Sequence, residues 1–166
     1  MKPDLLDWQV FQQAGWFRSL PKEIRELLDL TIVLCQQQKN NHSNYFDYSF
    51  LVFTAGKAYE GFLKYYLLEV KLIDEQLYKS KRFRIGRALN PDVHQDQRDE
   101  FWFYDDLAAN CTPELAKQIW TAWLECRNRV FHFFPDDLRG LNLEEALAKV
   151  EQIFLAIEAS MNCAHQ

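Results

Sequence analysis

The stretch YFDYSFLVFTAGKAYEGFLKYYLLEVKLI, residues 45–73, decides the fold of this 166-residue chain. Its apolar side chains recur at the three- and four-residue spacing of an α-helix, which places them along one face. The stripe that they form consists of Leu51, Ala55, Ala58, Phe62 and Tyr66. Such a stripe is typical of a helix buried in a bundle, so we expect one long helix over about residues 45–73.

The same stretch is long and apolar enough to raise the question of a membrane span. Lys57, Glu60 and Lys64 lie at its centre, where charges carry a large free-energy cost in a bilayer. We therefore expect a buried bundle helix and no membrane partner.

Residues that favour helix starts and stops flank this long helix. Ser19 and Pro21 predict that a helix begins near them, and Thr112, followed by proline, predicts another start. Asn142 is expected to cap the last helix. Pro135 is expected to stop the helix before it, because proline cannot continue the helical hydrogen bonds.

These elements predict an all-α fold, an up-and-down bundle of four main helices with a short N-terminal helix within residues 4–19. The length suits a single domain over residues 1–166, with an irregular insert at 74–112. Only five glycines and five prolines occur, too few for a β-sandwich, which needs a turn every 8–12 residues or so.

Charge is unevenly distributed along the chain. The net charge of −5 arises from a balance of +3 over residues 1–87 and of −8 over residues 88–166. An acidic protein is not an obvious nucleic-acid binder as a whole, although a local basic stretch remains a candidate.

The four cysteines indicate the redox state that we expect. Cys35, Cys111, Cys126 and Cys163 are scattered and form no CxxC pair, which disfavours a metal site. The first residues, MKPDLLDWQV, contain no apolar signal core. We expect a reduced, cytoplasmic protein without a metal or cofactor.

The stretch RNRVFHFF, residues 127–134, carries the candidate chemistry. Asn128 and His132 are four residues apart and share a helix face, so the amide can hold one ring nitrogen and fix the tautomer. Arg127 lies about 140° around a regular helix from His132, but its long side chain can still reach an anion beside the ring. An arginine and an oriented histidine suit phosphodiester cleavage.

A simpler interpretation of this motif remains open on the pattern alone. The spacing of Arg127 and His132 is common by chance. A lone histidine near a helix end most often interacts with the helix dipole or is a half-buried polar residue.

RNRVFH, residues 127–132, resembles the R-N-x-x-x-H motif of the HEPN superfamily of helical ribonuclease domains. AGKAYEGFLKYYL (55–67) is similar to the first long helix of that superfamily, and RIGRAL (84–89) to a short Ile-Gly segment of many members. One amphipathic helix is expected after the motif, as in the superfamily. As architecture the resemblance covers about residues 20–160, and only the RNxxxH pattern is specific.

The resemblance implies a metal-independent endoribonuclease in which the RNA 2′-OH attacks and a 2′,3′-cyclic phosphate remains. His132 would be the general acid or base, Arg127 would stabilise the phosphorane, and Asn128 would orient the site. It also implies a homodimer whose motifs share one cleft, a role as a prokaryotic toxin or phage-defence effector, and a cognate antitoxin or inhibitor.

Two further positions bear on the resemblance. In some HEPN toxins a glutamate on the early long helix joins the arginine and histidine, and Glu60 is placed to do so. Alternatively, Glu60 forms only an exposed ion pair with Lys64, worth about 0.3–0.5 kcal/mol. The sequence favours neither role of Glu60 over the other. Phe134 stands where many HEPN toxins carry a tyrosine that receives AMP, so that route of neutralisation is not expected here.

A basic stretch precedes the acidic half of the chain. Its residues are Lys79, Lys81, Arg82, Arg84 and Arg87, with Phe83 among them. The charges are candidates for RNA-backbone contacts and Phe83 for stacking on a base. The slightly favoured alternative is a solvated loop that pairs with the acidic run at 99–106.

Two other functional classes remain beside the ribonuclease. One is a non-catalytic HEPN-like module that binds a partner protein or RNA, and the other is a purely structural bundle.

Overall fold

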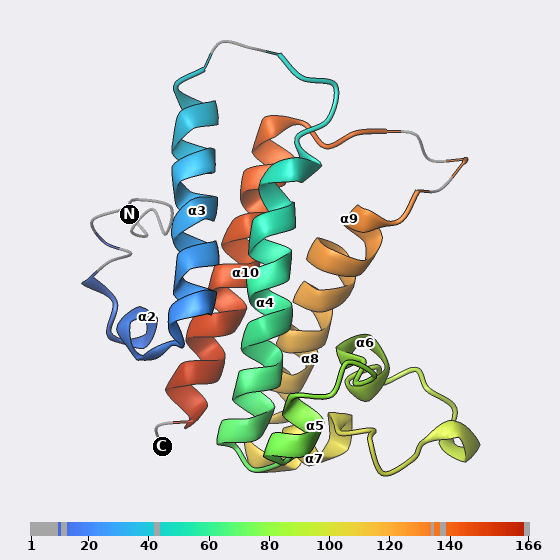
Figure 1. Ribbon diagram of the computed structural model, residues 1–166. Coiled ribbons are helices and arrows are strands. Elements are labelled where there is room, and N and C mark those ends of the chain that lie inside the picture. The colour runs from blue at the N-terminus through green and yellow to red at the C-terminus, as the bar shows by residue number, and fades with distance from the viewer. Residues whose placement is uncertain (1–9, 11–12, 42–43, 134, 137–138, 165–166) are drawn as a thin grey trace.

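Helices are the regular elements of the computed structural model, which describes residue 10 and residues 13–41, 44–133, 135–136 and 139–164 (Figure 1). No strand occurs in these ranges, and the predicted all-α class is confirmed. In chain order the elements are α2 Gly15–Ser19, α3 Lys22–Lys39, α4 Ser49–Glu69, α5 Glu75–Tyr78, α6 Ile85–Ala88, η1 Gln95–Gln97, α7 Tyr104–Asn110, α8 Pro113–Trp123, η2 Leu124–Asn128, α9 Arg129–Phe131 and α10 Leu143–Ala164.

The long helices form the predicted up-and-down bundle. The chain runs up α3, down α4, up the column of α8, η2 and α9, and down α10 (Figure 1). α4 packs against α3 and α10, and α10 also packs against α8. α2 lies within the range of the predicted N-terminal helix, of which residues 4–9 and 11–12 lie outside the described ranges.

α4 supplies the centre of the core. Every residue of the predicted apolar stripe is at most 1% exposed. The rings of Tyr59, Phe62 and Tyr66 stack in sequence, with centroids 6.2 and 5.7 Å apart. The Tyr59 hydroxyl donates to the Ile119 carbonyl of α8 (3.0 Å), and burial raises its pKa well above the usual value. The hydroxyl therefore stays a donor that ties α4 to α8.

The three predicted helix starts are confirmed, since α3 begins at Lys22, α8 at Pro113 and α10 at Leu143. The Thr112 hydroxyl accepts a backbone N–H of the first turn of α8 at 3.1 Å. Asn142 and Glu145 form a capping box, with the Asn142 Oδ1 accepting the Glu145 N–H (2.8 Å) and the Glu145 carboxylate accepting the Asn142 N–H (3.0 Å). Ser19 does not cap α3, because its hydroxyl donates to the Trp16 carbonyl (2.8 Å) and Pro21 holds the N-cap position.

α4 is shorter than predicted at both ends. It begins at Ser49, whose N–H donates to the Asp47 carboxylate at 2.9 Å. It ends before Lys71, which takes the left-handed conformation with φ 61°. The Leu72 N–H then donates to the Leu67 carbonyl (2.9 Å), as in a Schellman motif.

The segment 74–112 and the end of the helix before Pro135 also differ from the prediction. The segment 74–112, expected to be irregular, holds the short helices α5, α6, η1 and α7. The helix before Pro135 already ends at Phe131, because His132 is extended with φ −95° and ψ 134°. His132 therefore leaves the helical path, and the angle of 140° expected for a regular helix does not describe its position.

A disulfide joins Cys111, between α7 and α8, to Cys163 near the end of α10. Cys35 and Cys126 are free and buried. The prediction of reduced cysteines is wrong for the first pair. The two partners are 52 residues apart in the sequence and meet only because the bundle brings the start of α8 beside the end of α10.

Replacing Asn142 tests the capping box of α10. Asn142→Ala is expected to lower the free energy of unfolding by about 1 kcal/mol, because the Glu145 N–H loses its side-chain acceptor. Urea unfolding followed by circular dichroism measures the change. Asn162→Ala, an exposed position near the other end of α10, is the matched control and is expected to stay within about 0.5 kcal/mol of wild type.

Reduction tests the disulfide. Closing a loop of this length stabilises a fold by about 2–4 kcal/mol, so a thiol reductant should lower the Tm of the wild type by roughly 5–15 °C. The double variant Cys111→Ser/Cys163→Ser should show one Tm with and without reductant. Equal Tm values for the wild type under both conditions would contradict the pairing.

Candidate functional site

The motif residues lie on the column of α8, η2 and α9. η2, Leu124–Asn128, is a π-helical turn, which is wider than an α-helical one. Cys126 within it is buried, its Sγ lies 3.2 Å from the Gln152 Oε1 of α10, and burial raises its pKa to about 12. Lys149 of α10 donates to the Glu125 carbonyl (2.9 Å). These contacts hold one side of η2 against α10.

α4 approaches the opposite side of this column at Gly56. A Cβ at this position would lie 2.9 Å from the Phe131 Cε2 and 3.4 Å from the Arg127 Cγ. Any side chain at position 56 would therefore push the ring of Phe131 away. The absence of a side chain at Gly56 lets Phe131 and Arg127 lie directly against α4.

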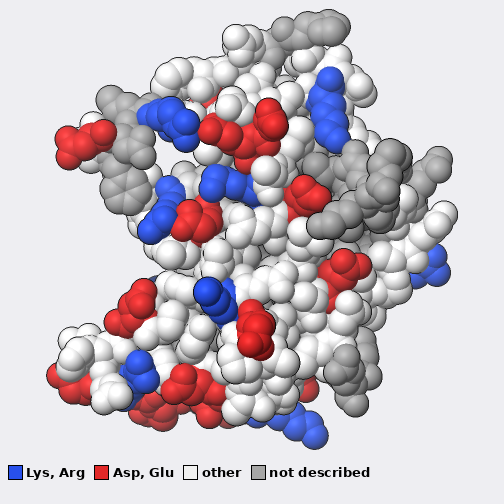
Figure 2. Space-filling model, turned by 180° about the vertical axis from the view of Figure 1, so that it is seen from behind, with Lys and Arg blue, Asp and Glu red and all other residues white. Residues whose placement is uncertain are grey.

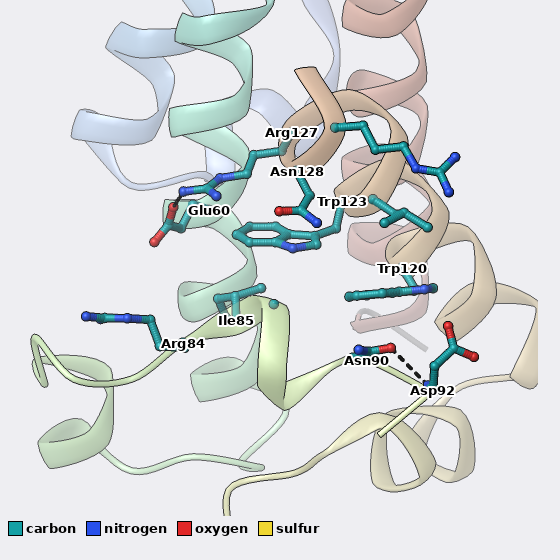
Figure 3. Close-up of a pocket in the computed structure, with 12 residues that line it drawn as sticks. Glu60, Arg84, Ile85, Asn90, Asp92, Trp120, Trp123, Arg127 and Asn128 are labelled. Carbon is teal, nitrogen blue, oxygen red and sulfur yellow. Dashed lines mark hydrogen bonds and ion pairs between the residues drawn. The ribbon is translucent and has the colours of Figure 1, made fainter. Parts of the chain in front are cut away.

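This close approach brings Arg127 to Glu60, as Figure 3 shows. The Arg127 Nη2 lies 3.0 Å from the Glu60 Oε2, and the two side chains are 32% and 34% exposed. The guanidinium also lies over the Trp123 ring, with Cζ 4.8 Å from the centroid. Lys64 is 4.0 Å from the other Glu60 oxygen, so Glu60 contacts both Arg127 and Lys64.

Asn128 holds His132 as the sequence predicts. The His132 Nε2 lies 2.9 Å from the Asn128 Oδ1, although the ring belongs to an exposed residue just beyond α9. An amide oxygen accepts, so Nε2 carries the proton in this arrangement. In the neutral ring Nδ1 then has the lone pair, which is the state of a general base.

Arg127 and His132 line two different cavities. The tryptophan cavity, of about 420 Å³, is lined by Trp120, Trp123, Arg127, Asn128 and residues 84–86, 90 and 92 among others. The histidine cavity, of about 680 Å³, is lined by His132, Phe131 and the chain around Asp47 and Gly140. Arg129 lines both. Within one chain the motif is therefore divided, with Arg127 and Asn128 in the tryptophan cavity and His132 in the histidine cavity beside it.

Two loops build the wall of the histidine cavity. The Asp47 carboxylate accepts the Ser49 N–H (2.9 Å), the Ser49 hydroxyl (2.7 Å) and the Leu141 N–H (3.0 Å). The Tyr48 N–H donates to the Leu141 carbonyl at 2.9 Å. Burial by itself would raise the pKa of Asp47, but the hydrogen bonds outweigh it and lower the pKa.

Exposed rings stand at the rim of the same cavity. Phe46 is 82% exposed and Phe133 is 79% exposed, both far above what large apolar side chains in a core show. Phe53 is 56% exposed and lies with its ring 5.6 Å from that of Phe131. Phe134 lies outside the described residues.

The basic stretch is divided by the fold. Phe83 is 4% exposed and packs on Phe103, with centroids 6.3 Å apart, so the prediction that it stacks on a base is wrong. Arg87 pairs with Asp99 (2.7 Å), which confirms for this residue the alternative of pairing with the acidic run. Lys79 pairs with Glu75 of α5 at 2.9 Å.

The remaining basic residues stay on the surface. Lys81, Arg82 and Arg84 are exposed, and the Arg84 Nη1 donates to the Lys81 carbonyl (2.6 Å). Arg84 is the member of the stretch that lines the tryptophan cavity beside Arg127. Of the basic stretch, only Arg84 lines the tryptophan cavity together with Arg127, and the other described basic residues of the stretch lie outside this cavity.

The sequence did not reveal several residues of these cavities. Trp120 is partly exposed and lines the tryptophan cavity, whereas Trp123 lines the same cavity and is 4% exposed. Asn90 and Asp92 reach the cavity from the loop after α6, and Arg129 connects the two cavities. The three-residue spacing of Trp120 and Trp123 places them on one helix face but does not show that this face lines a cavity. No sequence pattern marks a loop residue such as Asn90 as part of the cavity.

Charges are mixed over the surface in the view of Figure 2. Acidic and basic side chains alternate there, and the surface is hollowed at the edge where α6 and α9 lie. Within the described ranges no three His, Cys, Asp or Glu side chains gather as metal ligands would. No helix there combines the length and the apolarity that crossing a bilayer requires.

Comparison with known proteins finds no match, whether with a protein-family model, with a curated protein or with a solved structure.

The pKa of Asp47 gives a test of the loop contacts. Asp47→Ala removes three hydrogen bonds to a carboxylate and should lower the free energy of unfolding at neutral pH by about 1–3 kcal/mol. The pKa of Asp47 is lower in the folded than in the unfolded chain, so its stabilisation exists above about pH 4 and is lost as the pH falls through the folded value.

Urea midpoints at neutral pH and at about pH 3 measure this effect. The difference between wild type and Asp47→Ala should shrink at the lower pH. Asp106→Ala, at an exposed carboxylate of α7, is the control, for which no such convergence is expected. A constant difference for Asp47→Ala would refute the assigned role.

Proposed function

We propose that this protein is a metal-independent endoribonuclease of the HEPN type, acting as a prokaryotic toxin or phage-defence effector. The observation that carries the proposal is the hydrogen bond of 2.9 Å between His132 and Asn128 within the RNRVFH stretch. It holds the ring of His132 in one orientation at the surface, beside the histidine cavity.

In the proposed reaction His132 takes the proton of a ribose 2′-OH. The 2′ oxygen then bonds to the adjacent phosphorus, and the 5′ oxygen of the next nucleotide leaves with a proton supplied by an acid. The products are a 2′,3′-cyclic phosphate and a 5′-OH end. A single histidine can serve only one of the two proton transfers at a time.

Arg127 supplies charge in this proposal. Glu60 and Trp123 hold its guanidinium in one orientation, and a guanidinium has five N–H donors, so donors remain for phosphate oxygens. Preorganised donors of this kind stabilise the phosphorane more than flexible ones, because they need not reorient as charge develops. Glu60 is in this account a positioning residue.

A homodimer would complete the site. Arg127 and His132 of one chain line different cavities, so a second copy would bring a second histidine as the acid. The exposed rings of Phe46 and Phe133 beside His132 are the kind of side chains that such an interface buries. An antitoxin or other inhibitor would act by covering the same face.

The second candidate is a non-catalytic HEPN-like module that binds a partner protein or RNA. The observation that favours it is that the guanidinium of Arg127 already has two partners, the Glu60 carboxylate and the Trp123 indole. In that account the motif holds α4 to η2, and His132 is a surface residue. Toxicity during expression that Arg127→Ala relieves favours the nuclease over this module.

Removing the imidazole distinguishes the two candidates. His132→Ala is expected to slow cleavage of end-labelled RNA in EDTA by about 100-fold or more, because the proton transfer loses its catalyst. Its circular dichroism and Tm should stay at wild-type values, since His132 is exposed. His94→Ala, an exposed histidine that pairs with Asp96 and lies outside both cavities, is the matched control and should cleave normally.

Cleavage by a clean His132→Ala preparation at the wild-type rate would overturn the nuclease proposal. Binding of RNA without cleavage by any variant would favour the second candidate.

A further inference from the structure

The tryptophan cavity has the walls of a site for a planar ligand. Its volume of about 420 Å³ falls within the range of small-molecule sites, roughly 300–1,000 Å³. Aromatic, amide, carboxylate and guanidinium groups converge on it (Figure 3). None of these groups except Arg127, Asn128 and Glu60 has a role in the proposed reaction.

Trp120 provides the stacking surface. Trp123 is enclosed, because α6 packs on its Nε1 at Gly86, where a Cβ would lie 3.0 Å away, and Arg127 lies over its ring. Trp120 is partly exposed and lines the cavity from the same helix, α8. A base stacked on an aromatic side chain must be unpaired, which favours single-stranded RNA.

Asn90 and Asp92 lie near Trp120 in Figure 3 and form a donor–acceptor edge. The Asn90 Oδ1 already accepts the Asp92 N–H (2.9 Å), so its side-chain NH₂ is the group that can donate to a ligand. The Trp102 Nε1 donates to the Asn90 carbonyl (2.8 Å) and holds this loop in place. The Asp92 carboxylate can only accept.

This pattern is complementary to guanine. Guanine offers two adjacent donors, N1–H and N2–H₂, to a carboxylate, and its O6 accepts from an amide NH₂. Adenine offers a single donor on that edge and its ring N1 is an acceptor, which a carboxylate would repel. The edge therefore discriminates between the two purines.

A strand has a charged route from this cavity to the histidine. Arg84 and Arg127 line the tryptophan cavity, and Arg129 lines both cavities. A strand that runs from a base bound at Trp120 toward His132 would pass Arg129, which lines both cavities. Guanidinium groups along this route suit a phosphodiester backbone.

We propose that the tryptophan cavity binds one unpaired guanine of the RNA substrate, stacked on Trp120 with its edge read by Asn90 and Asp92. This inference rests on the proposed function for its substrate and adds to it the recognised base.

The test measures binding of fluorescein-labelled RNA octamers by anisotropy, with the full chain carrying His132→Ala so that no strand is cut. The octamers are uridine strands with one central guanine, adenine or inosine. The guanine strand is expected to bind about 5- to 150-fold more tightly than the adenine strand. Inosine, which lacks the N2 amino group, should fall between them. Asp92→Asn should remove the difference.

Variants of the stacking residue complete the test. Trp120→Ala is expected to weaken binding of the guanine strand by about 5- to 150-fold, and Trp120→Phe should retain most of the affinity because a ring remains. Phe101→Ala removes a ring that is 45% exposed but lies outside this cavity, and it should bind as the parent does. The oligonucleotide series tests the same site without any change at Trp120, so a folding defect of Trp120→Ala cannot conceal the answer.

The outcomes separate this inference from the proposed function. RNA cleavage by the wild type together with equal binding of all strands would overturn the guanine site and leave the nuclease standing. Binding that depends on Trp120 and guanine without cleavage by the wild type would support the site and overturn the nuclease. Absence of RNA binding in every case would overturn both.

Discussion

The contact of Phe131 and Arg127 with the bare backbone at Gly56 governs the geometry of the motif. A side chain there would meet the Phe131 ring at 2.9 Å, so α4 and the column of η2 and α9 could not approach as they do. The approach sets Arg127 beside Glu60 and over Trp123. It also turns the motif toward the surface instead of the core, since the other side of η2 is held by α10.

Two local departures from a regular helix then divide the motif. The π-helical turn of η2 and the extended backbone of His132 place Arg127 in one cavity and His132 in the next. Arg129 stands between them. In the proposed function this division is useful, because a strand that crosses Arg129 would meet the recognised base, the charge-stabilising arginine and the histidine in succession.

The sequence predicts those features that depend on neighbours in the chain. The stripe of α4, the caps at Thr112 and Asn142 and the pairing of Asn128 with His132 all follow from spacings of three or four residues. Features that depend on tertiary contacts were missed. Lys71 takes the left-handed conformation that ends α4, a position where glycine is usual. Phe83 is buried against Phe103. No sequence spacing predicts the π-helical turn or the disulfide.

In the proposed function this chain cuts RNA through the 2′-OH without a metal ion. The most direct measurement incubates the wild-type protein in EDTA with an RNA strand and with a strand of the same sequence in which every nucleotide is 2′-deoxy, and then analyses the product ends. The account predicts that the RNA is cut to 2′,3′-cyclic phosphate and 5′-OH ends while the deoxy strand stays intact. Cleavage of the deoxy strand, or RNA left whole at enzyme excess, would contradict it.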